Sequence, residues 1–446
     1  MMKNRCNDAG YTFEKIMTSI FSDKTGFLRK KIRENDHLSS LVIMSMRSGM
    51  LIAKFVLSLF IARYMGLEEL GMYGLIVGAA GTVQAFMRGG VFNTLSRDAV
   101  HQSPSELTVH LRYYGTGILA LYALLIPLCF GIGLYYDRPV FALLILAVFL
   151  TEHVSFDIFV LINNLQRQKL ANLILSLQSA SWIYLYVGLA FFLPSLRTLE
   201  TLLMFWTGGG LVAIAATVFV FRAWPWKDAF AEKIRLSWYP EKIRASWRLY
   251  ANEVLINLNL YVDRFLITAF ISLEVTGVYV FFFQIVQAIN NLVGAGVILV
   301  FRPRLIQAFK GNRLKDFRAL FQECMVRALG NTVFLSAVSI ALMPFVIRLT
   351  DKPLAMEFLP LFWLMLFASL FRVAATVAKS GIFAQHQDGM LLKLAIINFV
   401  FMCSAGILAL LFAGVYGIVS IMIATSLPPL FVMFKNRETR KIIPTE

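Results

Sequence analysis

The sequence Leu67-Glu-Glu-Leu-Gly-Met-Tyr-Gly74 returns, 206 residues later, as Leu273-Glu-Val-Thr-Gly-Val-Tyr-Val280. Both copies of this L-E-x-x-G-x-Y pattern stand where one long apolar run ends and the next begins. The same offset pairs Gln84 with Asn290, within the run that follows each copy. A second echo, at an offset of 219, pairs Q-R-Q at 166–168 with Q-H-Q at 385–387. Repeats in this register predict two halves built on one plan.

The composition indicates the surroundings in which these halves fold. Hydrophobic residues make up 58% of the 446 residues, and charged residues only 15%. A soluble globular protein is about 45–50% apolar and about 25% charged, so this chain has too little polar surface to face water. The composition excludes a cytosolic enzyme, a nucleic-acid-binding protein and a disordered scaffold, and it predicts an all-α integral membrane protein. The four cysteines stand singly, without the spacing of a disulfide framework or a metal site.

Apolar runs of about 20 residues, the length of a membrane-spanning helix, occur about twelve times. An even number of spans in two parallel repeats predicts two six-helix bundles, joined by a cytoplasmic linker and flanked by two cytoplasmic tails. The N-terminal tail is predicted either as an amphipathic helix on anionic lipid or as a disordered basic segment. The predicted parts are an N-terminal tail at 1–40, bundles at 41–221 and 247–434, a linker at 222–246 and a C-terminal tail at 435–446.

The Lys and Arg residues predict the orientation of these spans. Of the 42 in the chain, 32 fall in the tails and loops on the side of the N-terminus, and 5 fall in the opposite loops. Positive charge in short loops marks the cytoplasmic side of a membrane. Both termini are therefore predicted to be cytoplasmic, and the net charge of +16 is explained without nucleic acid.

Three features of the sequence resemble a known family. They are the basic pair Arg47 and Lys54 in the first span, the L-E-x-x-G-x-Y repeat, and N-x-x-x-D-R from Asn259 to Arg264. Together they resemble the polysaccharide-biosynthesis branch of the MATE-like flippases of the MOP superfamily. The resemblance implies a MATE-like pair of bundles in the bacterial cytoplasmic membrane. It also implies a flippase that moves O-antigen or capsule units on undecaprenyl diphosphate from the inner to the outer leaflet, with polysaccharide polymerases as partners.

Charged side chains inside the spans are the candidate substrate site. Each costs about 2.5–3.5 kcal/mol to insert, so a wet cavity, a partner or a substrate must compensate it. In the tenth span, Ser369, Arg372, Thr376 and Lys379 form one polar stripe, and arginine donors suit phosphate oxygens. The alternatives are a topology anchor for Lys379, and helix partners or backbone carbonyls for the arginines. The predicted cationic group is Arg47, Lys54, Arg88, Arg264, Arg372 and Lys379, and the predicted polar lining is Gln84, Asn257, Asn259, Gln287, Asn290 and Asn291.

Three carboxylates within the spans, Asp157, Glu253 and Asp263, are candidates for coupling transport to H⁺ or Na⁺. The alternative is a structural salt bridge between helices. By the offset of 219, His153 corresponds to Arg372, so an acidic helix of one half mirrors a basic helix of the other.

The alternative function is a cation-coupled multidrug efflux antiporter of the MATE type, for which an acidic cavity is expected. Five basic residues within the spans against four acidic ones favour an anionic cargo instead. No Walker loop, H-E-x-x-H motif or serine elbow occurs, so the sequence predicts neither an enzyme nor a cofactor.

Overall fold

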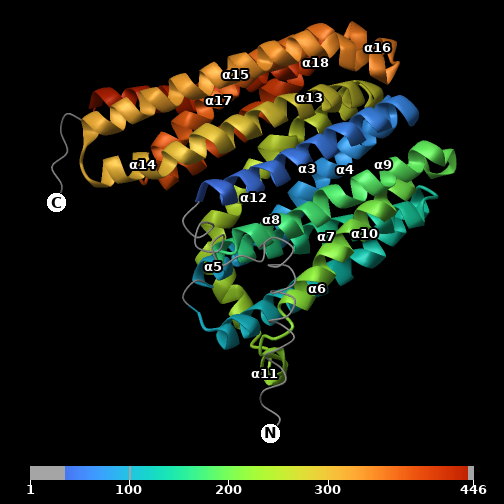
Figure 1. Cartoon of the computed structure of the whole chain (residues 1–446), viewed down its shortest axis with the longest axis vertical. Coiled ribbons are helices and arrows are strands. Elements are labelled where there is room, and N and C mark those ends of the chain that lie inside the picture. Colours follow the sequence, from blue (N-terminus) through green and yellow to red (C-terminus); the bar gives the residue numbers. More distant parts are fainter. Residues whose placement is uncertain (1–35, 100–101, 440–446) are drawn as a thin grey trace. The chain divides into compact units, whose positions relative to one another are not determined.

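The computed structural model describes residues 36–99 and 102–439, and every regular element in these ranges is a helix (Figure 1). The all-α prediction is confirmed. Nearly all of the predicted N-terminal tail, and residues 440–446 of the C-terminal tail, lie outside the described residues.

The helices follow one another in two halves of the chain. In the first half they are α3 (Asp36–Tyr64), α4 (Leu67–Arg88), α5 (Val91–Asp98), α6 (Pro104–Tyr135), α7 (Pro139–Asn164), α8 (Gln168–Ser176), the π-helical turn η1 (Leu177–Ser181), α9 (Trp182–Phe192), the 3-10 turn η2 (Pro194–Leu196), α10 (Leu199–Val220) and α11 (Trp226–Ala231). In the second half they are α12 (Trp238–Phe270), α13 (Leu273–Val293), the π-helical turn η3 (Gly294–Ile298), α14 (Leu299–Lys310), α15 (Leu314–Thr350), α16 (Pro353–Glu357), α17 (Leu359–Ala384) and α18 (Asp388–Thr439).

Ten helical segments of the described chain are long and apolar enough to cross a membrane, so the protein is a multi-pass membrane protein. The predicted count of about twelve differs for two physical reasons. Helix α12 is not among the ten, because polar residues such as Asn257, Asp263 and Arg264 interrupt its apolar sequence. Helix α18 counts once, although Gly414 leaves the helical conformation near its middle, with φ of 56° and ψ of −147°. The number twelve stays a prediction.

The helices divide into two compact units. Unit 1 comprises Met1–Leu57 and Ala80–Glu253, and unit 2 comprises Ser58–Ala79 and Val254–Glu446. Helices α3, α4 and α12 therefore each contribute residues to both units. Residues 58–79 fall within the predicted N-terminal bundle, but they belong to unit 2. The boundaries of the two predicted bundles stay a prediction.

Each unit is organised around one central helix. In unit 1, α7 packs between α6 and α10, and in unit 2, α17 packs against α15 and α18 (Figure 1). Local sequence fixes where several helices begin. Ser103 and Glu106 form a capping box at the start of α6, and the Ser272 hydroxyl accepts a hydrogen bond from the Val275 backbone N–H at the start of α13.

The two copies of the sequence repeat contact each other inside unit 2. A Cβ on Gly71 would collide with the backbone oxygen of Leu273, and a Cβ on Gly277 would collide with that of Leu67. The contact is reciprocal, since Leu67 and Gly71 correspond to Leu273 and Gly277 in the repeat. Small residues let helix backbones approach in a membrane, so the glycines are conserved between the copies for a steric reason.

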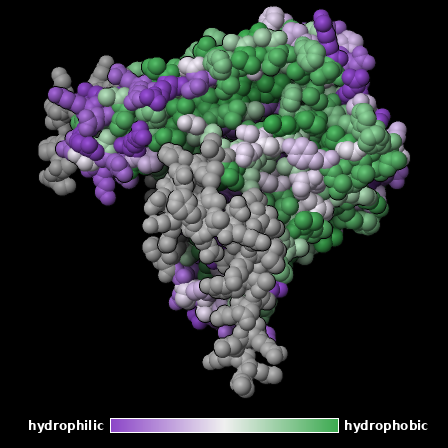
Figure 2. Space-filling view, viewed as in Figure 1, coloured by the Kyte–Doolittle hydropathy of each residue, from purple (hydrophilic) through white to green (hydrophobic). Residues whose placement is uncertain are grey.

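The surface of unit 2 matches a chain embedded in lipid. Hydrophobic residues cover the middle and later part of α15, and hydrophilic residues gather at the end where α14 meets α15 (Figure 2). Val333, Phe334 and Phe345 of α15 are more than half exposed. Apolar side chains exposed in such numbers are compatible with lipid and not with water.

We predict that Gly277→Ala destabilises the protein by about 1–3 kcal/mol, because the added methyl group must displace the Leu67 backbone. Gly330→Ala in α15 is the matched control, since no atom lies within 4 Å of a Cβ there. The free energy of unfolding in mixed micelles measures both. Equal stability of the two variants would contradict the close helix contact.

Candidate functional site

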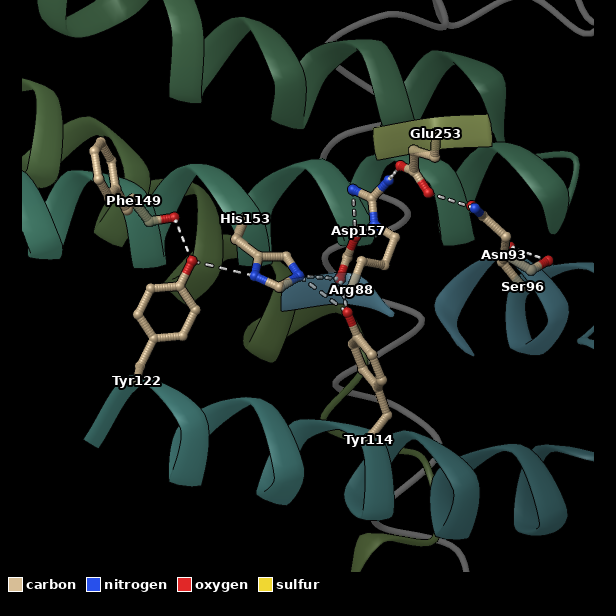
Figure 3. A network of polar contacts seen from close by, with 9 residues as sticks. All are labelled: Arg88, Asn93, Ser96, Tyr114, Tyr122, Phe149, His153, Asp157 and Glu253. Carbon is tan, nitrogen blue, oxygen red and sulfur yellow. Dashed lines mark hydrogen bonds and ion pairs between the residues drawn. The ribbon is translucent and has the colours of Figure 1, made fainter. Parts of the chain in front are cut away.

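Arg88, the last residue of α4, is the centre of a buried ionic network in unit 1 (Figure 3). Its side chain is 3% exposed, and its Nε and Nη2 atoms each lie 2.8 Å from Oδ1 of Asp157 on α7. Nη1 forms an ion pair with Glu253 of α12. The ring of Phe156 lies 4.9 Å from the guanidinium carbon. One cation is thus held by two carboxylates from two different helices.

Tyrosine and histidine side chains extend this network (Figure 3). The Tyr114 hydroxyl donates a hydrogen bond of 2.6 Å to Oδ2 of Asp157 and lies 3.0 Å from Nε2 of His153. Tyr122, two turns further along α6, lies 3.3 Å from Nδ1 of the same ring. The amide of Asn93 donates to Oε2 of Glu253 at 2.6 Å. The network therefore ties α4, α5, α6, α7 and α12 together.

A second buried group of charges lies in unit 2, around Asp263 and Arg264 of α12. The Asp263 carboxylate accepts hydrogen bonds from the Tyr279 hydroxyl and from the Arg264 backbone N–H, the latter at 2.8 Å. The Arg264 guanidinium donates to the Gly74 carbonyl at 3.3 Å and stacks on Phe283, 4.6 Å from the ring centroid. Both side chains are almost fully buried.

Arg372 of α17 is a half-buried cation of unit 2 whose donors have no hydrogen-bond acceptor among the described residues. Its guanidinium lies 5.6 Å from the Phe283 ring centroid, but within residues 36–99 and 102–439 it has no hydrogen-bond or ion-pair partner. The side chain is half-buried and lines a small cavity with room for about one water molecule, together with Ser369. Arg372 therefore keeps donors available for an anion.

Amide side chains lie near Arg372 on the facing helix α13. Ser369, one turn before Arg372, donates to Oδ1 of Asn290 at 3.3 Å. The Asn290 amide nitrogen is buried and finds no acceptor among the described residues. Gln287 donates to Asn291 at 3.1 Å. A cation beside an amide donor suits a ligand with phosphate and hydroxyl groups.

The predicted site residues separate into two sets. Arg47, Lys54, Gln84, Arg88, Asp157 and Glu253 belong to unit 1, and Asn257, Asn259, Asp263, Arg264, Gln287, Asn290, Asn291, Arg372 and Lys379 belong to unit 2. Within unit 1, Arg47 is exposed and donates to Asn172 at 3.0 Å, and Lys54 is exposed.

Four further predicted residues lie on α4, α12 and α17. Asn259 donates to backbone oxygens of Leu255 and Ala395, which satisfies its amide within the helix packing. Lys379 is exposed, and Asn257 is half-buried. In unit 1, the amide nitrogen of Gln84 is buried without an acceptor among the described residues.

Four side chains of the two charged groups were not predicted from the sequence: Tyr114, Tyr122, Tyr279 and Asn93. The i, i+4 spacing of His153 and Asp157 was a usable signal, since it places both on one face of α7. Tyr279 was visible as the tyrosine of the repeated L-E-x-x-G-x-Y pattern, though not as a partner of Asp263. Of the described residues, no group of three or more His, Cys, Asp or Glu side chains is arranged to hold a metal ion.

The chain matches one known protein family in sequence and several solved proteins in structure. Residues 39–309 match the sequence profile of the family described as polysaccharide biosynthesis protein. A search of curated protein sequences finds no match. Among solved structures, the chain is similar to the lipid II flippase MurJ in an inward closed conformation, with 14% identity, a TM-score of 0.67, and coverage of 91% of this chain and 88% of MurJ.

Two further solved structures are an inward-facing and an outward-facing multidrug resistance MATE family transporter of the MOP superfamily. Each has 11% identity and a TM-score of 0.62 and covers 90% of this chain, with 99% and 94% of the transporter covered. These likenesses establish the MATE-like fold that was predicted.

We predict that Arg88→Met lowers the free energy of unfolding by about 3–5 kcal/mol, because it leaves two carboxylates without their buried cation. Arg244→Met, at an exposed arginine of α12, is the matched control, with an expected change within about 0.5 kcal/mol. Denaturant titration in micelles provides the measurement. An Arg88→Met protein as stable as the control would show that Arg88 does not hold the network.

Proposed function

This chain belongs to the polysaccharide biosynthesis protein family, and we propose that it is a flippase for lipid-linked oligosaccharides. In this proposal it moves undecaprenyl-diphosphate-linked repeat units from the inner to the outer leaflet of a bacterial cytoplasmic membrane, with both termini in the cytoplasm. Among its solved structural neighbours, MurJ is a flippase for lipid II.

The proposal rests on one observation, the half-buried position of Arg372 and the free hydrogen-bond donors of its guanidinium within the described chain. A diphosphate without its water would cost tens of kcal/mol in a medium of low dielectric constant. A half-buried guanidinium without a hydrogen-bond partner in the described chain offers replacement donors at low cost. The lipid chain stays in hydrocarbon, so only the phosphorylated head group needs such a site.

The remaining charges of unit 2 support an anionic cargo. Arg264 and Arg372 are two cations, and Asp263 is the carboxylate that stands beside Arg264. The excess of one positive charge favours phosphate and disfavours an organic cation. We assign the amides of Asn290, Gln287 and Asn291 to the sugar hydroxyls, since they lie on the helix that faces Arg372.

The charges of unit 1 support a different role. Arg88 was predicted to bind substrate, but Asp157 and Glu253 already accept hydrogen bonds from its Nε and Nη1 atoms, and Nη2 forms an ion pair with Asp157. We therefore assign Arg88 to the network that it holds together, and we keep Arg47, Lys54 and Lys379 as exposed cations that attract the anionic head group. Asp157 and Glu253 remain candidates for coupling to H⁺ or Na⁺, and so does Asp263 in unit 2.

A cation-coupled multidrug antiporter is the second candidate function, because several structural neighbours are multidrug transporters. The specific observation in its favour is the buried group in unit 1, where two carboxylates contact one arginine. An efflux pump would export organic cations and would not need the unpaired Arg372.

We predict that Arg372→Gln lowers flipping of lipid-linked oligosaccharide about 10- to 100-fold at low substrate, because charge-assisted hydrogen bonds contribute about 1.5–3 kcal/mol. Reconstituted vesicles with a fluorescent lipid-linked oligosaccharide measure the rate. Arg348→Gln, an exposed arginine of α15, is the matched control and is expected to leave flipping unchanged.

Complementation of a bacterium that lacks its own flippase distinguishes the two functions. A flippase restores surface polysaccharide in a flippase-null bacterium and leaves drug susceptibility unchanged. Drug resistance without restored polysaccharide would establish the efflux alternative, and normal flipping by Arg372→Gln would remove Arg372 from the substrate site.

A further inference from the structure

Helices α14 and α15 form an antiparallel hairpin in unit 2, because only residues 311–313 connect them (Figure 1). Phe301 of α14 is 4% exposed. The guanidinium carbon of Arg304, one turn further along α14, lies 5.8 Å from the centroid of the Phe301 ring. The guanidinium carbon of Arg327 on α15 lies 5.7 Å from the same centroid. One buried ring thus brings two cations from different helices together.

The two cations beside Phe301 are not neutralised by their neighbours. Arg327 pairs with Glu323, one turn earlier on α15, at 2.5 Å. Arg304 is exposed, and in the described ranges of the chain it has no hydrogen-bond or ion-pair partner. From residue 302 to residue 327 the sequence has seven Lys or Arg residues and two Asp or Glu residues. The surface around Phe301 is therefore suited to an anion.

Arg302, the other arginine of α14, points in a different direction. Its Nη2 atom donates to the Ser380 hydroxyl of α17 at 3.3 Å, and its guanidinium carbon lies 5.6 Å from the centroid of the Phe383 ring. Arg302 therefore faces α17, whereas Arg304 faces the ring that it shares with α15. The pair of Arg304 and Arg327 does not belong to the group of residues around Arg372.

An exposed apolar surface adjoins the two arginines on the side away from the connecting turn. Val300, one turn before Arg304, is 50% exposed, and Phe334, two turns after Arg327, is 64% exposed. Gly330 lies on the same face of α15, and no atom lies within 4 Å of a Cβ there. Hydrophilic surface at the turn thus gives way to apolar surface beyond the arginines (Figure 2).

We propose that this hairpin binds an anionic phospholipid, phosphatidylglycerol, with its phosphodiester at Arg304 and Arg327 and one acyl chain along Val300, Gly330 and Phe334. Arginine forks suit phosphate oxygens, and basic sites between membrane helices bind lipid head groups. The long apolar stem of arginine also lets its cation reach the head-group layer from an apolar surface.

The apolar half of the surface favours a phospholipid over a soluble phosphate. A free phosphate would match the two arginines but would leave Val300 and Phe334 uncovered. A zwitterionic phospholipid would cover them but would bring a second positive charge to a surface that already has an excess of positive charge. This lipid site goes beyond the proposed function and does not rest on it.

Native mass spectrometry of the full chain in micelles tests the site, with titration of phosphatidylglycerol or of zwitterionic phosphatidylethanolamine. We expect one phosphatidylglycerol to bind about 10- to 30-fold more tightly than phosphatidylethanolamine, as two surface arginines allow. The double variant Arg304→Gln/Arg327→Gln is expected to bind the two lipids equally. Equal binding of both lipids by the wild-type protein would overturn the proposal.

Lys310→Gln/Lys315→Gln is the matched control, because it removes two exposed cations from the turn end of the same hairpin. It is expected to keep the preference for phosphatidylglycerol. An equal loss of preference in both double variants would show diffuse attraction by the basic surface, with no site. Glycerol phosphate is expected not to compete, and its displacement of phosphatidylglycerol at equal concentration would show a site for free phosphate instead.

The position of the acyl chain is tested on the wild-type protein, so this test does not depend on whether a variant folds. Phosphatidylglycerol with a diazirine in one acyl chain is incorporated into micelles with the full chain and activated by light. We expect the label on peptides that contain Val333 or Phe334, which are both more than half exposed. Labelling spread evenly over the exposed apolar helices would contradict the proposed site.

Discussion

Arg88 and its two carboxylates form the interaction on which the structure of unit 1 depends. An ion in an apolar interior loses its water, and it stays charged only where fixed partners replace that water. Asp157 from α7 and Glu253 from α12 provide those partners, so three helices are fixed at one buried atom group. Tyr114 and His153 complete the polar surroundings. Glu253, one of the polar residues of α12, thus helps to position that helix.

In unit 2 the buried charges are compensated in a different way. Asp263 is matched by Tyr279 and Arg264, whereas Arg372 rests on an aromatic ring and keeps its donors. The acidic and basic helices that correspond through the repeat, α7 and α17, therefore became different sites. In our account, α7 belongs to a closed ionic network, and α17 carries the arginine that receives phosphate.

The sequence predicts the fold well because bilayer thickness and apolar length are directly related. The L-E-x-x-G-x-Y repeat also predicts two related halves. It does not predict that Gly71 and Gly277 come into contact, because a match between two stretches of sequence carries no information on the distance between them. The candidate charges were identified from their presence in apolar runs. Their partners could not be identified in this way, because Arg88 lies 69 residues from Asp157 and 165 residues from Glu253 in the sequence. Only the packing of α4, α7 and α12 shows that these carboxylates pair with Arg88 and not with a cation of the first span.

The central claim is that Arg372 remains open for a phosphorylated head group while Arg88 is closed by carboxylates. The most direct measurement is a cryo-electron-microscopy structure of the full chain with a bound undecaprenyl-diphosphate-linked oligosaccharide. Our account predicts phosphate density within hydrogen-bond distance of the Arg372 guanidinium, with Asp157 and Glu253 still on Arg88. Phosphate density on Arg88 with its carboxylates displaced, or Arg372 paired with Asp263 beside a bound substrate, would contradict the account.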